Sequence, residues 1–295
     1  MRETEFIRSL TGIGELEENS KGIGDDAALL GGCLISKDIM AEGVHYLLEE
    51  TEAGIARRLI ASNVSDICAM GGKGEKYYAL LGAGLSCKIN PAAFSAAFRK
   101  ECRRYNITLL GGDTIASPVS FFSMTIIGQA NRFVLTRCGA KMGDIIYLSR
   151  PIGKAKVMLD RRLSGDFSGN GDFPPETGLG ELLGSMEGVT SCIDISDGLG
   201  VDLFRVSEMS ETAFHLSAED IPLGAEGIAA RDAVCSGEEY ALMFTLSQDR
   251  SECLENAVKE KLNRKVYRIG KVLQGLGVFM DGEDISELGY RHKLG

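Results

Sequence analysis

Apolar residues in the first half of the chain follow strand and helix spacing in turn. The short apolar runs 27–30 and 33–39 flank Gly31-Gly32, a pattern that predicts a β-hairpin. Residues 51–70 have helical apolar spacing, with a threonine suited to cap the helix and a Gly-Gly pair that would end it. The same criteria predict strands at 77–85 and 120–128, a helix at 91–105, and a short buried strand at 107–110.

A second block of elements begins near Arg137. Strands are predicted at 145–148, 192–195 and 240–246, and helices at 154–163, 178–186, 199–209 and 250–262. These elements lack the regular alternation of a βαβ fold, which favours the α+β class. We therefore expect two domains, formed by residues 1–135 and residues 136–295.

The net charge of the chain argues against some classes of binding partner. The 295 residues include 32 Lys and Arg against 42 Asp and Glu, a formal net charge of −10. This balance argues against a non-specific nucleic-acid or membrane-surface binder, since such proteins present basic surfaces. No apolar run approaches the ~18 residues of a membrane helix, and the N-terminus lacks the pattern of a signal peptide. We expect a cytoplasmic protein with neither a nucleic-acid nor a membrane partner.

Cysteine and histidine offer little for a metal site. The eight cysteines are scattered without a C-x-x-C pair, so we expect small apolar core residues. Three histidines are too few for a His-rich metal site. Glycine is more informative, because many of the 37 glycines stand beside acidic residues.

Four short motifs place an aspartate beside glycine or another small residue at the end of a regular element. They are Gly22–Asp26, Asn63–Asp66, Gly111–Thr114 and Asp194–Gly198. A fifth acidic segment, Ser36–Asp38, ends the predicted hairpin. Glycine lets the backbone approach a ligand closely, and carboxylates are oxygen ligands that Mg²⁺ prefers. These motifs together predict a magnesium site that would bind a phosphorylated ligand.

Each motif also has a simpler interpretation. Asp113 and Asp197 are suited to cap the elements that follow them, and Asp25-Asp26 is suited to a turn. Asp66 is harder to explain in this way, because it lies among apolar residues in the middle of a predicted helix. A carboxylate near a buried face needs a partner, and a metal ion is the simplest one.

Familiar phosphate-binding motifs do not occur in the sequence. None of the three Gly-Lys pairs is followed by Ser or Thr, which excludes a P-loop, and the H-R-D and D-F-G elements of protein kinases are missing. A bound nucleotide would therefore be held mainly by metal ions, glycine backbone and a few basic side chains.

The ordered set of motifs resembles that of thiamine-monophosphate kinases, in the superfamily of ATP-binding enzymes related to aminoimidazole ribonucleotide synthetase. The resemblance covers nearly the whole chain, from about residue 22 to the tail that contains Tyr290. The segments that carry it are Gly22–Asp26, Ser36–Asp38, Glu42–Tyr46, Asn63–Gly71, Gly111–Thr114, Arg137–Ala140, Asp194–Leu199 and Gly237–Leu242.

The resemblance implies Mg²⁺-dependent transfer of the ATP γ-phosphoryl group to thiamine monophosphate, giving thiamine diphosphate and ADP. It implies a two-domain α+β fold, with a homodimer built through mixed α/β N-terminal domains that bind metal and ATP. The C-terminal domain would complete the nucleotide and substrate site. The acceptor phosphate is already anionic, so no general base is needed, and direct in-line transfer is the expected mechanism.

Residue roles follow from the same resemblance. Several Mg²⁺ ions would be held by Asp26, Ser36, Asp38, Asp66, Asp113, Asp194 and Asp197, of which Asp66, Asp113 and Asp197 are the expected catalytic residues. ATP would contact Gly112, Asp113, Arg137 and Ser196. Thiamine monophosphate would contact His45, Glu238 and Tyr290.

The chain departs from the family pattern at several positions. Lys37 stands where the family has a hydroxyl ligand, which predicts an altered magnesium dependence because a protonated lysine is not a metal ligand. Further departures at 172–176 and in Gly237–Leu242 lie on the expected substrate side. Two alternatives therefore stay open: an ATP-dependent enzyme of the same superfamily with another acceptor, and a nucleotide-binding protein that has lost catalysis.

Overall fold

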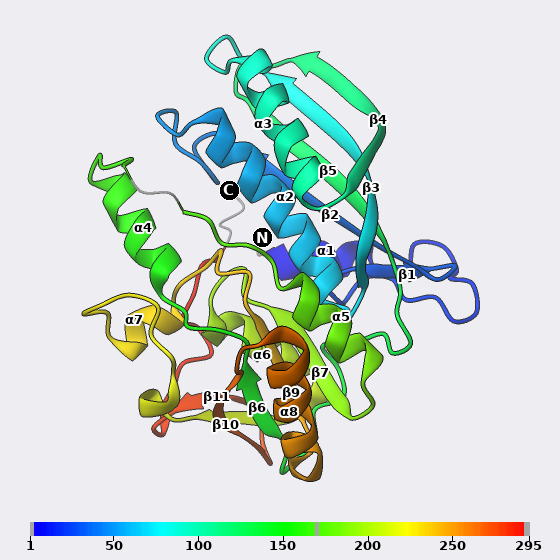
Figure 1. Cartoon of the computed structure of the whole chain (residues 1–295), viewed down its shortest axis with the longest axis vertical. Coiled ribbons are helices and arrows are strands. Elements are labelled where there is room, and N and C mark those ends of the chain that lie inside the picture. The colour runs from blue at the N-terminus through cyan, green and yellow to red at the C-terminus, as the bar shows by residue number, and fades with distance from the viewer. Residues whose placement is uncertain (1–2, 169–170, 292–295) are drawn as a thin grey trace.

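Two β-sheets, one from each half of the chain, form the framework of the computed structural model (Figure 1). The structure describes residues 3–168 and 171–291. Helices cover both sheets, and the two apolar cores lie between helices and strands. This arrangement confirms the predicted α+β class.

The N-terminal sheet has five strands in the order β1-β2-β5-β3-β4. Their bounds are β1 (Ala28–Leu30), β2 (Cys33–Ala41), β3 (Lys73–Leu85), β4 (Ile107–Ala116) and β5 (Phe121–Gln129). The predicted hairpin is confirmed as the antiparallel pair β1–β2. β3 and β4 run parallel, which requires the crossover helix α3 (Pro91–Arg104) between them. The short helix α1 (Glu3–Leu10) precedes the sheet.

The C-terminal sheet has seven strands in the order β12-β11-β8-β10-β6-β9-β7. Their bounds are β6 (Ile145–Leu148), β7 (Val189–Asp194), β8 (Ala213–Leu216), β9 (Leu242–Leu246), β10 (Tyr267–Leu273), β11 (Gly277–Met280) and β12 (Glu283–Asp284). The helices of this half are α4 (Lys154–Leu163), α5 (Thr177–Ser185), α6 (Leu199–Ser210), α7 (Ala230–Val234) and α8 (Ser251–Leu262). Short 3₁₀ turns occur at Ala218–Asp220 and Gln248–Arg250.

Helix α2 (Glu52–Ala69) lies between the two halves of the molecule. It packs against β2, β5 and α3 of the N-terminal half, and against α5 and β7 of the C-terminal half. The Thr51 side chain caps it, accepting a hydrogen bond from the backbone N–H of Gly54. Twelve of its 18 residues are buried, so nearly every face of the helix is covered. The acidic Asp66 therefore lies close to both sheets.

Close packing of α5 against the end of α2 depends on glycine. A Cβ atom on Gly184 would lie 2.0 Å from the carbonyl oxygen of Gly71, a backbone atom that cannot rotate away. We expect Gly184→Ala to lower the free energy of unfolding by roughly 1–3 kcal/mol, as overpacking does. Chemical denaturation measures this change. Gly178→Ala on the same helix is the control, because its Cβ would meet only the flexible end of Leu262. An equal loss in both variants would contradict the packing explanation.

Two sequence predictions are wrong in detail. The strand predicted at 107–110 continues as β4 to Ala116, and its residues from Leu109 onward are exposed, because β4 is an edge strand. The cysteines are not all core residues, since Cys87, Cys138 and Cys253 are exposed. None of the helices in the described ranges combines the length and apolar composition that a membrane crossing requires.

Candidate functional site

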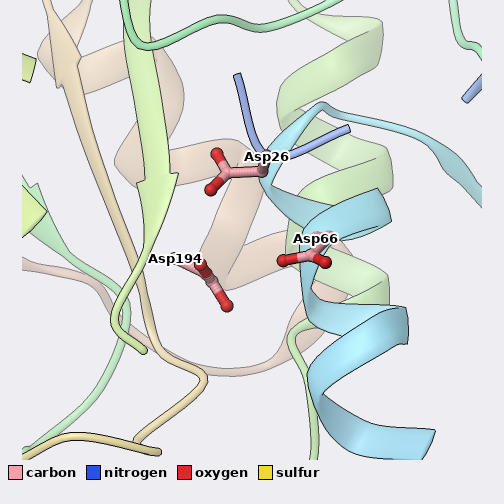
Figure 2. A group of neighbouring side chains, drawn as sticks. All are labelled: Asp26, Asp66 and Asp194. Atoms are coloured by element: carbon pink, nitrogen blue, oxygen red, sulfur yellow. The ribbon is translucent and has the colours of Figure 1, made fainter. Parts of the chain in front are cut away.

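Three aspartates from distant parts of the sequence meet between the two sheets. Asp26, Asp66 and Asp194 each offer a carboxylate oxygen, and these atoms all lie within 4.8 Å of one another. Figure 2 shows the three side chains around a common point. Asp66 comes from α2, Asp194 is the last residue of β7, and Asp26 lies in the segment before β1. The structure therefore brings residues from three of the sequence motifs together.

The carboxylates of this cluster are costly to ionise together. Burial raises the pKa of Asp66 well above its usual value, and the charges of Asp38 and Asp194 raise it further. Burial is also the largest cause of the raised pKa of Asp194, followed by the charge of Asp26. Without a cation, burial and charge repulsion favour the protonated forms of Asp66 and Asp194.

The donor set of the cluster fits a divalent cation. Oδ2 of Asp26 is buried and has no hydrogen-bond partner among the described residues. Two hydroxyls hold the neighbouring carboxylates: Ser36 donates to Asp66 Oδ2, and Ser65 donates to Asp194 Oδ2 at 2.6 Å. Carboxylate and hydroxyl oxygens with no nitrogen or sulfur ligand suit Mg²⁺.

Arg137 adds a positive charge at the edge of the cluster. Its guanidinium donates to Asp26 Oδ1 at 2.5 Å, and its backbone N–H donates to Asp25 at 2.8 Å. Arg137 thus pairs with Asp26 Oδ1, whereas Oδ2 has no hydrogen-bond partner in the part of the chain that the structure describes. The predicted nucleotide contact thus lies beside a predicted metal ligand.

The turn after β7 carries Ser196 and Asp197, and Asp202 fixes its shape. One carboxylate oxygen of Asp202 accepts the backbone N–H groups of Ser196, Asp197 and Gly198 at 3.0 Å each. Arg205 bridges Asp202 and Asp197, donating at 2.6 and 2.5 Å. The backbone N–H of Tyr290 donates to the carbonyl of Asp197 at 2.8 Å, which brings the C-terminal tail to this turn.

The two predicted substrate contacts His45 and Glu238 also lie close together, although 193 positions separate them in sequence. One side chain, Arg58 of α2, touches both: it donates to the carbonyl of His45 and to Glu238 Oε1 at 2.7 Å. The charges of Asp197 and Glu238 both contribute to the raised pKa of Asp38, after burial as the main cause. Asp38 therefore lies within electrostatic reach of both Asp26 of the acidic cluster and Glu238 of the predicted substrate side.

Asp113 does not join the other aspartates within one chain. On β4, Asp113 pairs with Gly82 of β3. Gly82 also pairs with Ser123 of β5, and Ser123 pairs with Ile39 of β2. Three strand spacings of about 4.8 Å thus separate β4 from β2. Asp113 shares the exposed face of the sheet with Ile39, whereas Ser36 faces α2.

Gly112 has a structural reason to be glycine. A Cβ atom there would lie 1.8 Å from the carbonyl oxygen of Leu81 on the neighbouring strand. Lys37 also lies away from the cluster, because side chains alternate along β2. Its ammonium donates to Thr125 at 3.4 Å on the exposed face that carries Asp113.

Sequence reasoning missed the residues that hold the site in place, namely Ser65, Asp202, Arg205 and Arg58. Asp202 and Arg205 stand three apart at the start of the helix after the 194–198 motif, a spacing that suggests one helix face. Arg58 offered the same signal as Asp66, a charge within an apolar helical run.

Family models match most of the chain. The model "AIR synthase related protein, N-terminal domain" covers residues 24–130, and the corresponding C-terminal domain covers residues 143–281. The fold is thus that of an AIR synthase related protein. Among curated relatives, thiamine-monophosphate kinases of Buchnera aphidicola and Haemophilus influenzae are each 30% identical. The alignments cover 82% and 87% of this chain, and 81% and 84% of the relatives. The chain belongs to the thiamine-monophosphate kinase family.

Solved structures agree with this family. The thiamine-monophosphate kinase of Stenotrophomonas maltophilia is 29% identical, with a TM-score of 0.76 over 95% of each chain. AaThiL, solved in complex with AMPPCP and TMP, has a TM-score of 0.85 at 24% identity, over 99% of this chain and 97% of that chain. A HypE–HypF complex has the same fold, with a TM-score of 0.75 at 17% identity.

Proposed function

We propose that this protein is a Mg²⁺-dependent thiamine-monophosphate kinase, which transfers the γ-phosphoryl group of ATP to thiamine monophosphate. The observation that carries the proposal is the cluster of Asp26, Asp66 and Asp194 in a chain of this family. The complex of AaThiL with AMPPCP and TMP supports the same pair of substrates. An enzyme with another acceptor is less favoured, because the two 30% identical relatives described above are both thiamine-monophosphate kinases.

We propose that the acidic cluster holds Mg²⁺ through Asp26, Asp66 and Asp194, with Ser36, Asp38 and Asp197 as further ligands. Bound Mg²⁺ would neutralise the phosphate oxygens of both substrates and lower the repulsion between two polyanions. Asp66 and Asp197 would hold and orient the ions. The Asp197 side chain is 20% exposed, and its partner Arg205 supplies a fixed positive charge.

The remaining site residues are proposed to bind the two substrates. Arg137 and Ser196 would contact ATP, since both lie beside proposed metal ligands. His45, Glu238 and Tyr290 would contact thiamine monophosphate. The anionic acceptor oxygen needs no general base, so the chain's residues act by binding, orienting and neutralising charge.

Product analysis tests the proposed function. Purified protein is incubated with ATP, Mg²⁺ and thiamine monophosphate, and thiamine diphosphate and ADP are separated and quantified. Equal amounts of the two products are expected. ADP without thiamine diphosphate would indicate another acceptor, and ATP binding without either product would indicate a non-catalytic protein.

We also propose a homodimer built through the N-terminal sheet. The sheet face opposite α2 carries exposed apolar side chains, and a second copy would bury them. These are Ile39, Tyr78, Leu80 and Ile115, which are 42–53% exposed. A two-fold axis along the strands would place the β2 side of one copy over the β4 side of the other. Asp113 and Gly112 of each copy would then lie over β2 of the partner, the strand whose opposite face carries Ser36, and would act at the partner's site.

Mixing two inactive variants tests this shared site. Asp66→Ala and Asp113→Ala are each expected to be inactive as homodimers. Refolded together in equal amounts, they should recover about a quarter of wild-type activity, because half of the dimers are mixed and one of their two sites is intact. The assay is thiamine diphosphate formation. A mixture as inactive as its parents would place Asp66 and Asp113 in the same chain's site or exclude the dimer.

The domain roles and location complete the proposal. Residues 1–135 would bind metal and ATP and form the dimer, and residues 136–295 would complete the nucleotide and substrate site. We propose a cytoplasmic location, where ATP and Mg²⁺ are available.

A further inference from the structure

We infer that Arg58 is a positioning residue for the phosphate acceptor, an inference that rests on the proposed function. Its guanidinium joins three segments: helix α2, the 42–50 loop with His45, and the 237–240 turn with Glu238. The sequence marks Arg58 only as a charge within an apolar helical run, and its positioning role is inferred from these contacts.

All three guanidinium nitrogens of Arg58 have protein partners. Nη1 donates to Glu50 Oε2 at 2.9 Å, Nε donates to Glu238 Oε1 at 3.3 Å, and Nη2 donates to Glu238 Oε1 at 2.7 Å and to the His45 carbonyl. The Arg58 side chain is 8% exposed, whereas that of Glu238 is 39% exposed. Arg58 is therefore a buried support, and Glu238 is the partner that reaches solvent.

The charge of Arg58 is well compensated. Burial alone would disfavour its charged form, but the carboxylates of Glu238 and Glu50 outweigh that effect and raise the pKa of the arginine. Glu50 is itself buried and receives a second cation, Arg162 of α4, at 3.3 Å. Its other oxygen accepts the backbone N–H of Leu47 at 3.0 Å, which ties the carboxylate to the loop that carries His45.

The 237–240 turn needs such a support. Glu238 and Tyr240 both have positive φ angles, +56° and +48°, a backbone region that side chains other than glycine rarely adopt. Such backbone conformations persist only where surrounding contacts stabilise them. Two contacts do so at Glu238: its side chain accepts hydrogen bonds from Arg58, and its backbone N–H donates to the Ser196 carbonyl at 2.8 Å. Arg58 thereby fixes the position of Glu238 relative to His45, and both residues are proposed to contact thiamine monophosphate.

An Arg58→Lys variant tests this inference. Lysine keeps the charge but cannot reproduce the planar fork that reaches several acceptors at once. We expect the KM for thiamine monophosphate to rise about tenfold, with the KM for ATP within about twofold of wild type. Arg57→Lys on the same helix is the control, because Arg57 lies 3.9 Å from Glu101, outside the site. Equal rises in both KM values, or none, would overturn the inference.

A double-mutant cycle separates positioning from general destabilisation. If Arg58 acts through Glu238, Arg58→Lys combined with Glu238→Gln should weaken acceptor binding no more than the worse single variant. Additive losses would contradict the inference. Should Arg58→Lys fail to fold, Glu50→Gln gives the same comparison of KM values from the other end of the network.

Calorimetry of thiamine monophosphate binding to wild type distinguishes a failure of the Arg58 inference from a failure of the proposed function. Binding without product formation would count against the kinase but leave the Arg58 comparison measurable as affinities. A wild-type protein that neither binds nor phosphorylates thiamine monophosphate would overturn both.

Discussion

An Asp66→Asn variant is expected to form thiamine diphosphate roughly 10²–10³ times more slowly than wild type, while its fold becomes more stable. The amide keeps the shape of the side chain but removes the charge that would hold Mg²⁺ between two substrates. It also relieves the repulsion that raises the pKa of Asp66. We expect its thermal midpoint in a chelating buffer at neutral pH to rise by about 3–6 °C.

Steady-state kinetics and thermal unfolding check the two halves of this prediction. Asp160→Asn is a suitable control, because Asp160 is an exposed residue of α4 that pairs only with Lys156 among the described residues. The control should change neither quantity. An Asp66→Asn variant that kept wild-type turnover would remove Asp66 from the proposed metal site.

Removing divalent cations is expected to abolish turnover and to make the protein less stable as the pH rises. Asp66, Asp194 and Asp38 have raised pKa values in the folded state, so the folded protein binds protons more tightly than the unfolded chain. Their contribution to stability is complete below the unfolded pKa of about 4 and is lost as the pH rises through the raised folded values. Mg²⁺ should restore the lost stability, because it replaces the protons.

Thermal unfolding between about pH 5 and 8, with chelator and with Mg²⁺, measures this linkage. The rise in thermal midpoint on adding Mg²⁺ should increase with pH in wild type. It should be smaller in Asp66→Asn. A gain that is independent of pH and equal in both proteins would show that Mg²⁺ binds elsewhere.

Local sequence patterns predicted much of the fold. The hairpin at Gly31-Gly32 and the helix after Thr51 follow from turn chemistry and apolar spacing, which act over a few residues. The extension of β4 beyond Leu110 was not predicted, because an exposed glycine-rich segment has no strand pattern of its own. Pairing with β3 decides its conformation.

The sequence identified the residue types of the candidate site better than it predicted how those residues are arranged in space. Asp66 could be singled out because a charge inside an apolar helix needs a partner. The placement of Asp113 could not be anticipated, because the face of a strand depends on register and on the bulge between β3 and β4. The supports Arg58 and Asp202 act across long sequence separations, and no local pattern connects them with their partners.

The most direct test is to locate the metal. Mn²⁺, which takes the same oxygen ligands as Mg²⁺, can be soaked into crystals of the protein, and an anomalous difference map then shows its position. We predict a peak about 2.2 Å from carboxylate oxygens of Asp26, Asp66 and Asp194. A map with no peak among these three side chains, in crystals where Mn²⁺ supports turnover, would contradict a metal site at this cluster.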